Sequence, residues 1–224
     1  IHFPSTGYIR RRSCETRLDR VTLPDATKPE SYLRGWSPPP NNRSQGQMKL
    51  DVVKLTKELV SYNSESLTTN VPVTEHVARV MKSIGFQIER LAYDDVNGVP
   101  KLCIVGKLGK GRGGLTLMSH DDVVPAKMEQ GWTADPYKVR TAGGKLYGRG
   151  VCDMKGPLAA TLCAAAAYKA KDLDSAPLFI VVTADEEIQA RGAWEVTKRS
   201  KLLQEAAGGY GLICEPTRLK VVYA

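Results

Sequence analysis

One apolar run, PLFIVVTAD at residues 177–185, constrains the fold of this chain more than any other stretch of its sequence. A strand that is apolar at nearly every position, rather than at every second one, is typical of a sheet that helices cover on both faces. Shorter β-rich runs stand at 86–93, 101–108, 114–120, 209–214 and 219–224. The sequence therefore predicts a central sheet in which the run at 177–185 is a buried strand.

Segments of helical periodicity alternate with these runs. Helices are expected at 48–62, 71–86, about 154–171 and 192–205, and a hairpin is expected at 137–150. The first helix would place on one face Leu50, Val53, Leu55, Leu59 and Val60. Gly85 is expected to end the second helix, and Gly143 with Gly144 to form the hairpin turn. Helices that alternate with buried strands predict an α/β fold with helices on both faces of one sheet.

Residues 1–47 differ from the rest of the chain. They hold six of the 13 prolines and carry a net charge of +4, from eight basic and four acidic side chains, out of +8 in total. No sustained helix or strand period runs through them, so we expect a disordered or non-native extension ahead of Met48. The short RRR at 10–12 lacks interleaved aromatic residues, and no nucleic-acid partner is expected.

Composition excludes several classes of protein. Hydrophobic residues make up 42% of the chain and charged residues 25%, a balance typical of soluble globular proteins. No apolar run reaches the roughly 18–20 residues that a membrane span needs, so no membrane partner is expected. The five cysteines form no C-x-x-C pair, which favours reduced thiols in a cytoplasmic protein.

Acidic residues and one histidine follow the expected strands. The candidates are His120 with Asp122, Asp185 with Glu186 and Glu187, Glu215, and Asp153 after the hairpin. In open α/β sheets, ligands bind beyond the carboxyl ends of the strands. Carboxylates gathered there repel one another, and burying them unpaired is costly, so a cation is expected among them. One histidine among several carboxylates suits zinc, cobalt or manganese.

Each of these features also has an ordinary explanation when it stands alone. A single histidine at a strand end is most often a surface or capping residue, and an acidic DEE run is favourable in the first turn of a helix. The glycine-rich segment at 106–114 lacks the phosphate-loop pattern and leads into a strand, which favours a hairpin loop. The combination and the order of the features carry the prediction.

Five short motifs occur in a fixed order: SHDDVVP, W-x-x-D-P-Y, LYGRGVCDMKG, TADEE and CEPT. Together they resemble the zinc-dependent deacylase and exopeptidase family of acetylornithine deacetylase, succinyl-diaminopimelate desuccinylase, aminoacylase and glutamate carboxypeptidase. The resemblance covers residues 48–224, and Ser119 stands where the family more often has glycine. It implies a three-layer α/β catalytic domain, of which 48–224 would be the N-terminal portion. A lid that mediates dimerisation and a final metal-binding histidine would lie beyond this sequence.

The resemblance also implies a role for each site residue. It implies two divalent metal ions, zinc first and cobalt or manganese as alternatives, held by His120, Asp153, Glu187 and Glu215. Asp153 would bridge the ions, His120 and Glu215 would hold one, and Glu187 would hold the other. The catalytic residues implied are Glu186, as general base, and Asp122, which would accept an N–H of the His120 ring and orient it. Asp121 should point to the opposite side, because side chains alternate along a strand.

The activity implied is hydrolysis of an amide bond in N-acyl amino acids or small peptides. A di- or carboxypeptidase is the alternative within enzymes, and a truncated, non-catalytic metal-binding or interaction module is the alternative outside them. The resemblance implies a full-length homodimer formed through the lid. It also implies that residues 48–224 alone are inactive, since the last ligand is absent from this sequence.

Overall fold

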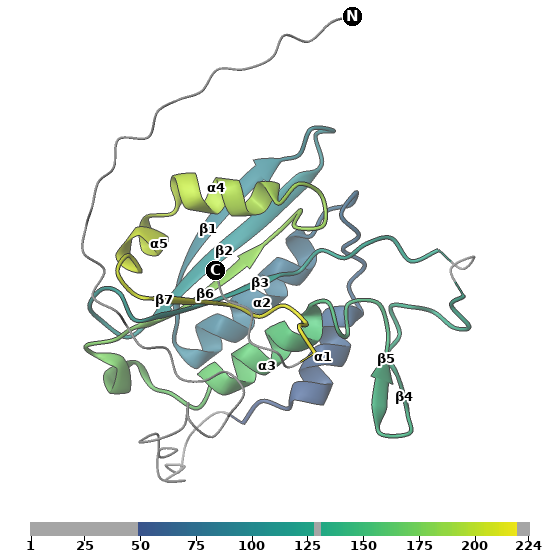
Figure 1. Ribbon diagram of the computed structural model, residues 1–224, viewed down its shortest axis with the longest axis horizontal. Helices are drawn as coiled ribbons and strands as arrows, with labels where there is room; N and C mark the ends of the chain where they lie inside the picture. Colours follow the sequence, from purple (N-terminus) through teal and green to yellow (C-terminus); the bar gives the residue numbers. More distant parts are fainter. Residues whose placement is uncertain (1–48, 128–130, 219–224) are drawn as a thin grey trace, which may run out of the picture. The chain divides into compact units, whose positions relative to one another are not determined.

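The computed structural model describes residues 49–127 and 131–218 (Figure 1). The expectations for 1–47 and for a strand at 219–224 lie outside the described residues. The elements are α1 (Val52–Val60), α2 (Val71–Ile84), β1 (Gln87–Asp94), β2 (Pro100–Leu108), β3 (Leu115–His120), β4 (Arg140–Ala142), β5 (Lys145–Tyr147), α3 (Lys155–Ala165), a 3₁₀ helix (Ala170–Leu173), β6 (Leu178–Thr183), α4 (Arg191–Arg199), α5 (Lys201–Glu205) and β7 (Tyr210–Ile213). Within these ranges, no helix is both long and apolar enough to cross a membrane.

The main sheet has five strands in the order β1-β2-β6-β3-β7. β6 lies at its centre, and Leu178 to Val182 on this strand are buried, which explains why the run is apolar at successive positions. β3 is parallel to both β6 and β7, whereas β1 and β2 pair antiparallel. The carboxyl ends of β3, β6 and β7 therefore lie at one edge of the sheet.

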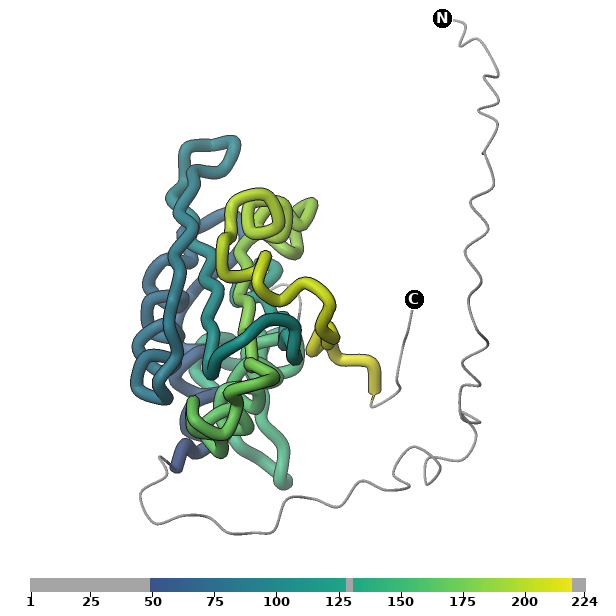
Figure 2. The backbone as a smooth tube through the Cα atoms, turned by 90° about the vertical axis from the view of Figure 1, so that its left-hand side faces the viewer, coloured from purple at the N-terminus to yellow at the C-terminus, as the bar shows by residue number. Residues whose placement is uncertain are grey.

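Helices cover both faces of this sheet, as the sequence predicted. α1, α2 and α3 pack on one face around a core that includes Leu59, Met81, Ile104, Leu158 and Ile180. α4 and α5 pack on the other face around Cys103, Val105, Val181, Val196 and Leu202. Successive residues of β2 alternate between the two cores, which is the period of a strand. Figure 1 shows α4 in front of the strands with α2 behind them, and Figure 2 shows the same layers from the side.

Local signals explain where several elements begin and end. The carboxylate of Asp51 accepts the backbone N–H of Lys54 and so caps the start of α1. Gly85 ends α2 in the left-handed conformation, with φ of 110°, as its position in the sequence predicted. Val53 was expected on the same helical face as Leu55 and Leu59, which are buried, but it is 42% exposed.

The helix expected at 192–205 is in fact two helices, and that prediction is wrong. Ser200 adopts an extended conformation between α4 and α5, and its hydroxyl accepts the N–H of Leu203. The carboxylate of Glu89 on β1 accepts the Ser200 hydroxyl and the N–H groups of Lys201 and Leu202. A serine cap and a carboxylate from a distant strand thus start a new helix where the sequence pattern alone is continuous.

The expected helix at 154–171 is also shorter than predicted, since α3 ends at Ala165 and a 3₁₀ turn follows at Ala170–Leu173. The hairpin prediction is confirmed. β4 and β5 form a separate two-stranded sheet, and its turn residues Gly143 and Gly144 have φ of 55° and 71°. Both turn positions therefore need the left-handed region that glycine adopts at no steric cost.

Candidate metal centre

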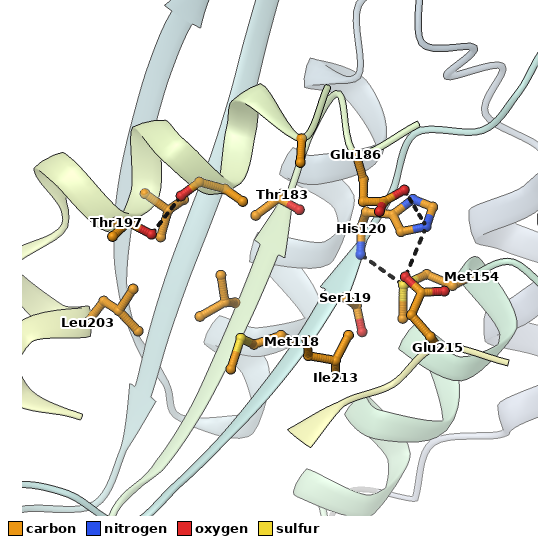
Figure 3. Close-up of a pocket in the computed structure, with 14 residues that line it drawn as sticks. Met118, Ser119, His120, Met154, Thr183, Glu186, Thr197, Leu203, Ile213 and Glu215 are labelled. Carbon is orange, nitrogen blue, oxygen red and sulfur yellow. Dashed lines mark hydrogen bonds and ion pairs between the residues drawn. The ribbon is translucent and has the colours of Figure 1, made fainter. Parts of the chain in front are cut away.

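Three parallel strands bring polar side chains to the same edge of the main sheet. His120 is the last residue of β3, Glu186 and Glu187 lie in the turn after β6, and Glu215 follows β7. Asp153 comes from a fourth segment, directly before α3. Figure 3 shows the side chains of Glu186 and Glu215 on either side of the His120 ring. The structure thus gathers, at one place, His120, Asp153, Glu186, Glu187 and Glu215. Asp185, which the sequence also singled out, instead forms an ion pair with Lys101.

The imidazole of His120 is the centre of this group. Its Nε2 atom lies 3.2 Å from an Asp153 oxygen, 3.5 Å from a Glu215 oxygen and 3.8 Å from a Glu186 oxygen. The His120 side chain is only 2% exposed, whereas these three carboxylates are 34–50% exposed. A buried imidazole therefore presents one nitrogen to partly accessible acids. Beside them lies a cavity of about 330 Å³ that His120, Glu186 and Glu215 help to line.

The ligand atoms fall into two sets that share His120. One set joins His120 with Asp153 and Glu215, the other joins it with Glu186 and Glu187, and within each set the atoms lie within 4.8 Å of one another. Imidazole nitrogen and carboxylate oxygen are ligands that zinc, cobalt and manganese accept. These residues fit a divalent metal ion. Glu187 lies in the set without Glu215, but this set also holds His120 and Glu186, whereas the resemblance implied separate ions for His120 and Glu187 and no ligand role for Glu186.

The negative charges of the carboxylates around His120 also favour a bound cation. Burial opposes a charge on His120, but its hydrogen bond to Asp122 and the charges of Asp122, Glu215 and Glu186 raise its pKa to about 9. Burial raises the pKa of Glu187, and the charge of Asp153 raises it further. Burial and, more weakly, neighbouring carboxylates also raise the pKa of Glu215. A divalent ion at the shared point would offset this repulsion among the acids.

Asp122 holds the acidic turn as well as the histidine. The Nδ1 atom of His120 lies 2.9 Å from the backbone carbonyl of Asp122 and 3.4 Å from its carboxylate. The carboxylate accepts the Ser66 hydroxyl at 2.7 Å and the backbone N–H groups of Glu186 and Glu187 at 3.0 and 3.3 Å. The acceptor nearest to the His120 ring is thus the backbone carbonyl of Asp122. The sequence analysis expected the carboxylate of Asp122 in this role.

Asp121 points away from the cluster, as strand alternation predicted. Its carboxylate is fully buried and accepts hydrogen bonds from Asn70 at 2.8 Å and from Thr74 at 2.6 Å. Burial raises the pKa of this carboxyl above its ordinary value. The nearby Lys155, also buried, donates its Nζ proton to the carbonyl of Tyr62 rather than to the acids of the cluster.

The sequence analysis missed the residues that support the cluster from the segment at 63–70. Ser66 donates to Asp122, and Asn70 donates to Asp121, yet the sequence analysis singled out neither residue. They stand more than 50 positions before the residues they bind, so no local pattern marks them. Met154 was also missed; its sulfur accepts the backbone N–H of His120 at 3.1 Å.

Comparison with known proteins agrees with this geometry. Residues 116–223 match the profile of peptidase family M20/M25/M40. The chain is 38% identical over 172 residues to the acetylornithine deacetylase of Myxococcus xanthus, an alignment that covers 75% of this chain and 42% of that protein. It is 32% identical over 184 residues to the succinyl-diaminopimelate desuccinylase of Wolbachia pipientis subsp. Culex pipiens, covering 76% of this chain and 42% of that protein.

Solved structures show the same architecture. Human carnosine dipeptidase 1 is similar with a TM-score of 0.61 and 25% identity, over 72% of this chain and 37% of that one. The dipeptidase Dug1p of Saccharomyces cerevisiae is similar in fold with a TM-score of 0.53 and 20% identity, over 72% of this chain and 37% of that one. The chain spans less than half the length of the curated relatives it matches. The resemblance carried by the five ordered motifs is confirmed by the match of residues 116–223 to peptidase family M20/M25/M40 and by the similarity to an acetylornithine deacetylase and a succinyl-diaminopimelate desuccinylase.

Proposed function

We propose that the protein is a metal-dependent hydrolase that cleaves the amide bond of N-acyl amino acids or small peptides. The observation that carries this proposal is the convergence of Asp153, Glu186 and Glu215 on the Nε2 atom of His120. The names of the relatives give the substrate class, since they act on acetylornithine and on succinyl-diaminopimelate. The dipeptidases among the solved structures support a peptidase as the alternative.

We assign the ligands of two divalent ions, with zinc as the first candidate and cobalt or manganese as alternatives. His120 and Glu215 would hold one ion, Glu187 the other, and Asp153 would lie between them. Such ions polarise a scissile carbonyl and lower the pKa of a bound water. We propose that a further ligand for the Glu187 ion lies outside this sequence.

Glu186 is the residue that we assign as general base. Its carboxylate is 43% exposed, lines the cavity and lies 3.8 Å from the Nε2 atom of His120. Its backbone N–H donates to the carboxylate of Asp122, the residue whose carbonyl lies 2.9 Å from the His120 ring. A carboxylate placed in this way can take a proton from water and return it to the leaving amine.

The finer features of the whole protein are also proposals. We infer that residues 48–224 are the N-terminal portion of a catalytic domain, which fits the 42% of each relative that the chain covers. We further propose a cytoplasmic homodimer, formed through a lid domain that this sequence does not contain.

The test is turnover by the full-length gene product, loaded with zinc, on N-acetylornithine, N-succinyl-diaminopimelate and a set of dipeptides. Release of free amine from one of these, abolished by a chelator and restored by zinc, is the expected result. Zinc bound at His120 without cleavage of any substrate would favour the non-catalytic metal-binding module. Cleavage of dipeptides alone would favour the peptidase.

A further inference from the structure

A buried ion pair stands next to the candidate base, outside the metal-binding cluster. The Nζ atom of Lys101 on β2 lies 2.7 Å from an oxygen of Asp185, the residue before Glu186, and the side chains are 0% and 5% exposed. A pair this deeply buried is weak evidence for stability, because removing both charges from water costs about as much as their attraction returns. Its position at the start of the acidic turn indicates another role.

Lys101 joins this turn to the segment that supports Asp122. Besides its ion pair, its ammonium group donates to the carbonyls of Ser66 at 2.6 Å and of Thr68 at 2.8 Å. The ammonium group therefore makes two hydrogen bonds and one ion pair, each to a different residue. Ser66, in turn, donates its hydroxyl to the carboxylate of Asp122. Lys101 thus fixes Asp185, the residue that precedes Glu186. It also fixes the backbone of Ser66, whose hydroxyl donates to Asp122.

Asp185 is held in a conformation that few residues adopt. Its φ is 55°, in the left-handed region, where residues other than glycine are uncommon. Its second carboxylate oxygen accepts the hydroxyl of Tyr93 on β1 at 2.8 Å. On the other side of the turn, the next two N–H groups, of Glu186 and Glu187, bind Asp122. A strained residue persists when its surroundings over-determine it, and here both sides of the turn are anchored.

We propose that the Lys101–Asp185–Tyr93 network positions Glu186, by fixing the turn that directs the carboxylate toward His120 and the cavity. This inference rests on the function proposed above for Glu186. None of the three network residues lines the cavity. They are positioning residues, which act on the reaction through the turn.

The experiment compares Lys101→Met, Asp185→Asn and Tyr93→Phe with the wild type in the zinc-loaded, full-length gene product. The matched control is Lys107→Met, because Lys107 lies on the same strand, about 20 Å further along, and forms a partly buried ion pair with Glu205. We expect Lys101→Met and Asp185→Asn to lower kcat about 10- to 100-fold, the usual effect of losing an outer support of a metal site, with zinc content and KM nearly unchanged. Lys107→Met should leave kcat within about twofold.

A second readout is independent of turnover. Hydrogen exchange of the Glu186 and Glu187 backbone amides should become about tenfold faster or more in Lys101→Met and Asp185→Asn, since the turn loses an anchor, and should not change in Lys107→Met. Tyr93→Phe removes one hydroxyl only, and it should show the same changes at a smaller size. This milder variant decides the question if Lys101→Met fails to fold.

Two results would overturn the positioning role. One is unchanged exchange at both amides in the network variants. The other is a loss of zinc that accounts for the whole loss of kcat, which would make the network a support of metal binding alone. If the wild type cleaves no amide, the proposed function fails, but the exchange rates still decide whether Lys101 fixes the turn.

Discussion

The two faces of the main sheet are covered to different extents. On the face beneath α1, α2 and α3, Leu59, Met81 and Leu158 are all 0% exposed. On the other face, α4 and α5 leave β7 partly uncovered, and Ile213 is 64% exposed. Ile213 lines the cavity that reaches His120 and Glu186. The closed face holds the fold together, and the open face leaves room beside the candidate metal centre.

The largest expected effect tests the chemistry on the open side. In the full-length gene product, the proposed function predicts that Glu186→Gln lowers kcat by about 10²–10⁴-fold while zinc stays bound, because the amide cannot accept a proton from water. Glu187→Gln should instead weaken zinc binding, since a neutral amide oxygen is a poorer ligand than a carboxylate. Metal content and turnover, measured on both variants, separate the two roles. Zinc loss in the Glu186 variant with normal zinc in the Glu187 variant would reverse the assignment.

The next effect contrasts the two faces in stability. Leu158→Ala should lower the free energy of unfolding by about 2–5 kcal/mol, because it leaves a cavity in a closed core. Ile213→Ala should change it by no more than about 0.5 kcal/mol, as is usual for an exposed site. Denaturant unfolding of both variants gives the comparison. Equal losses would mean that the open face is as well packed as the closed one.

A smaller effect concerns pH and the attachment of α5. Burial acts to raise the pKa of Glu89, but hydrogen bonds from Ser200, Lys201 and Leu202 outweigh it and lower the pKa below the ordinary value of 4.5. The ionised carboxylate therefore contributes stability above about pH 4.5, and this contribution is lost as pH falls through the lower, folded-state pKa. Glu89→Gln should cost about 1 kcal/mol at pH 7 by weakening the cap of α5.

The same substitution provides its own control for pH. The stability difference between Glu89→Gln and the wild type should shrink in acid, when the wild-type carboxylate is also neutral. Unfolding measured from pH 7 down to pH 3 would show it. A difference that stays constant over this range would mean that the charge of Glu89 has no part in holding α5.

The smallest effect is expected at the N-terminus. If the two covered faces of the sheet are sufficient for the fold, deletion of residues 1–47 should leave Tm unchanged, as their proline content and lack of periodicity predict. Thermal unfolding of the chain that begins at Met48 is the measurement. A fall of several degrees would show that this segment contributes to the fold.

Sequence patterns predicted the parts of the molecule that depend on local periodicity or on a single residue type. The apolar run of β6, the end of α2 at Gly85 and the turn at Gly143 are of this kind. The break at Ser200 depends on Glu89, which is 111 positions away, and no local signal distinguishes it from a continuous helix. Lys101 stood in an apolar run and gave no indication of its partner Asp185. The helix break at Ser200 and the ion pair of Lys101 both depend on contacts between segments that are far apart in the sequence.

The candidate site was predictable to a similar extent. His120, Asp153, Glu186, Glu187 and Glu215 could be named because each follows a strand or precedes a helix in a recognisable motif. Their supports could not be named, because Ser66 lies in a polar segment with no pattern and binds Asp122 across 56 positions. Only the folded chain shows that the carbonyl of Asp122 contacts the His120 ring, while its carboxylate accepts the N–H of Glu186.

Anomalous X-ray scattering at the zinc edge, from crystals of the zinc-loaded full-length protein, tests the central claim most directly. The account predicts a zinc ion about 2.0–2.1 Å from the Nε2 atom of His120, with oxygens of Asp153 and Glu215 at comparable distances. It also predicts that His120→Ala removes or displaces this ion. Zinc bound elsewhere, or an ion that keeps its position in His120→Ala, would contradict the assignment of this cluster as the metal centre.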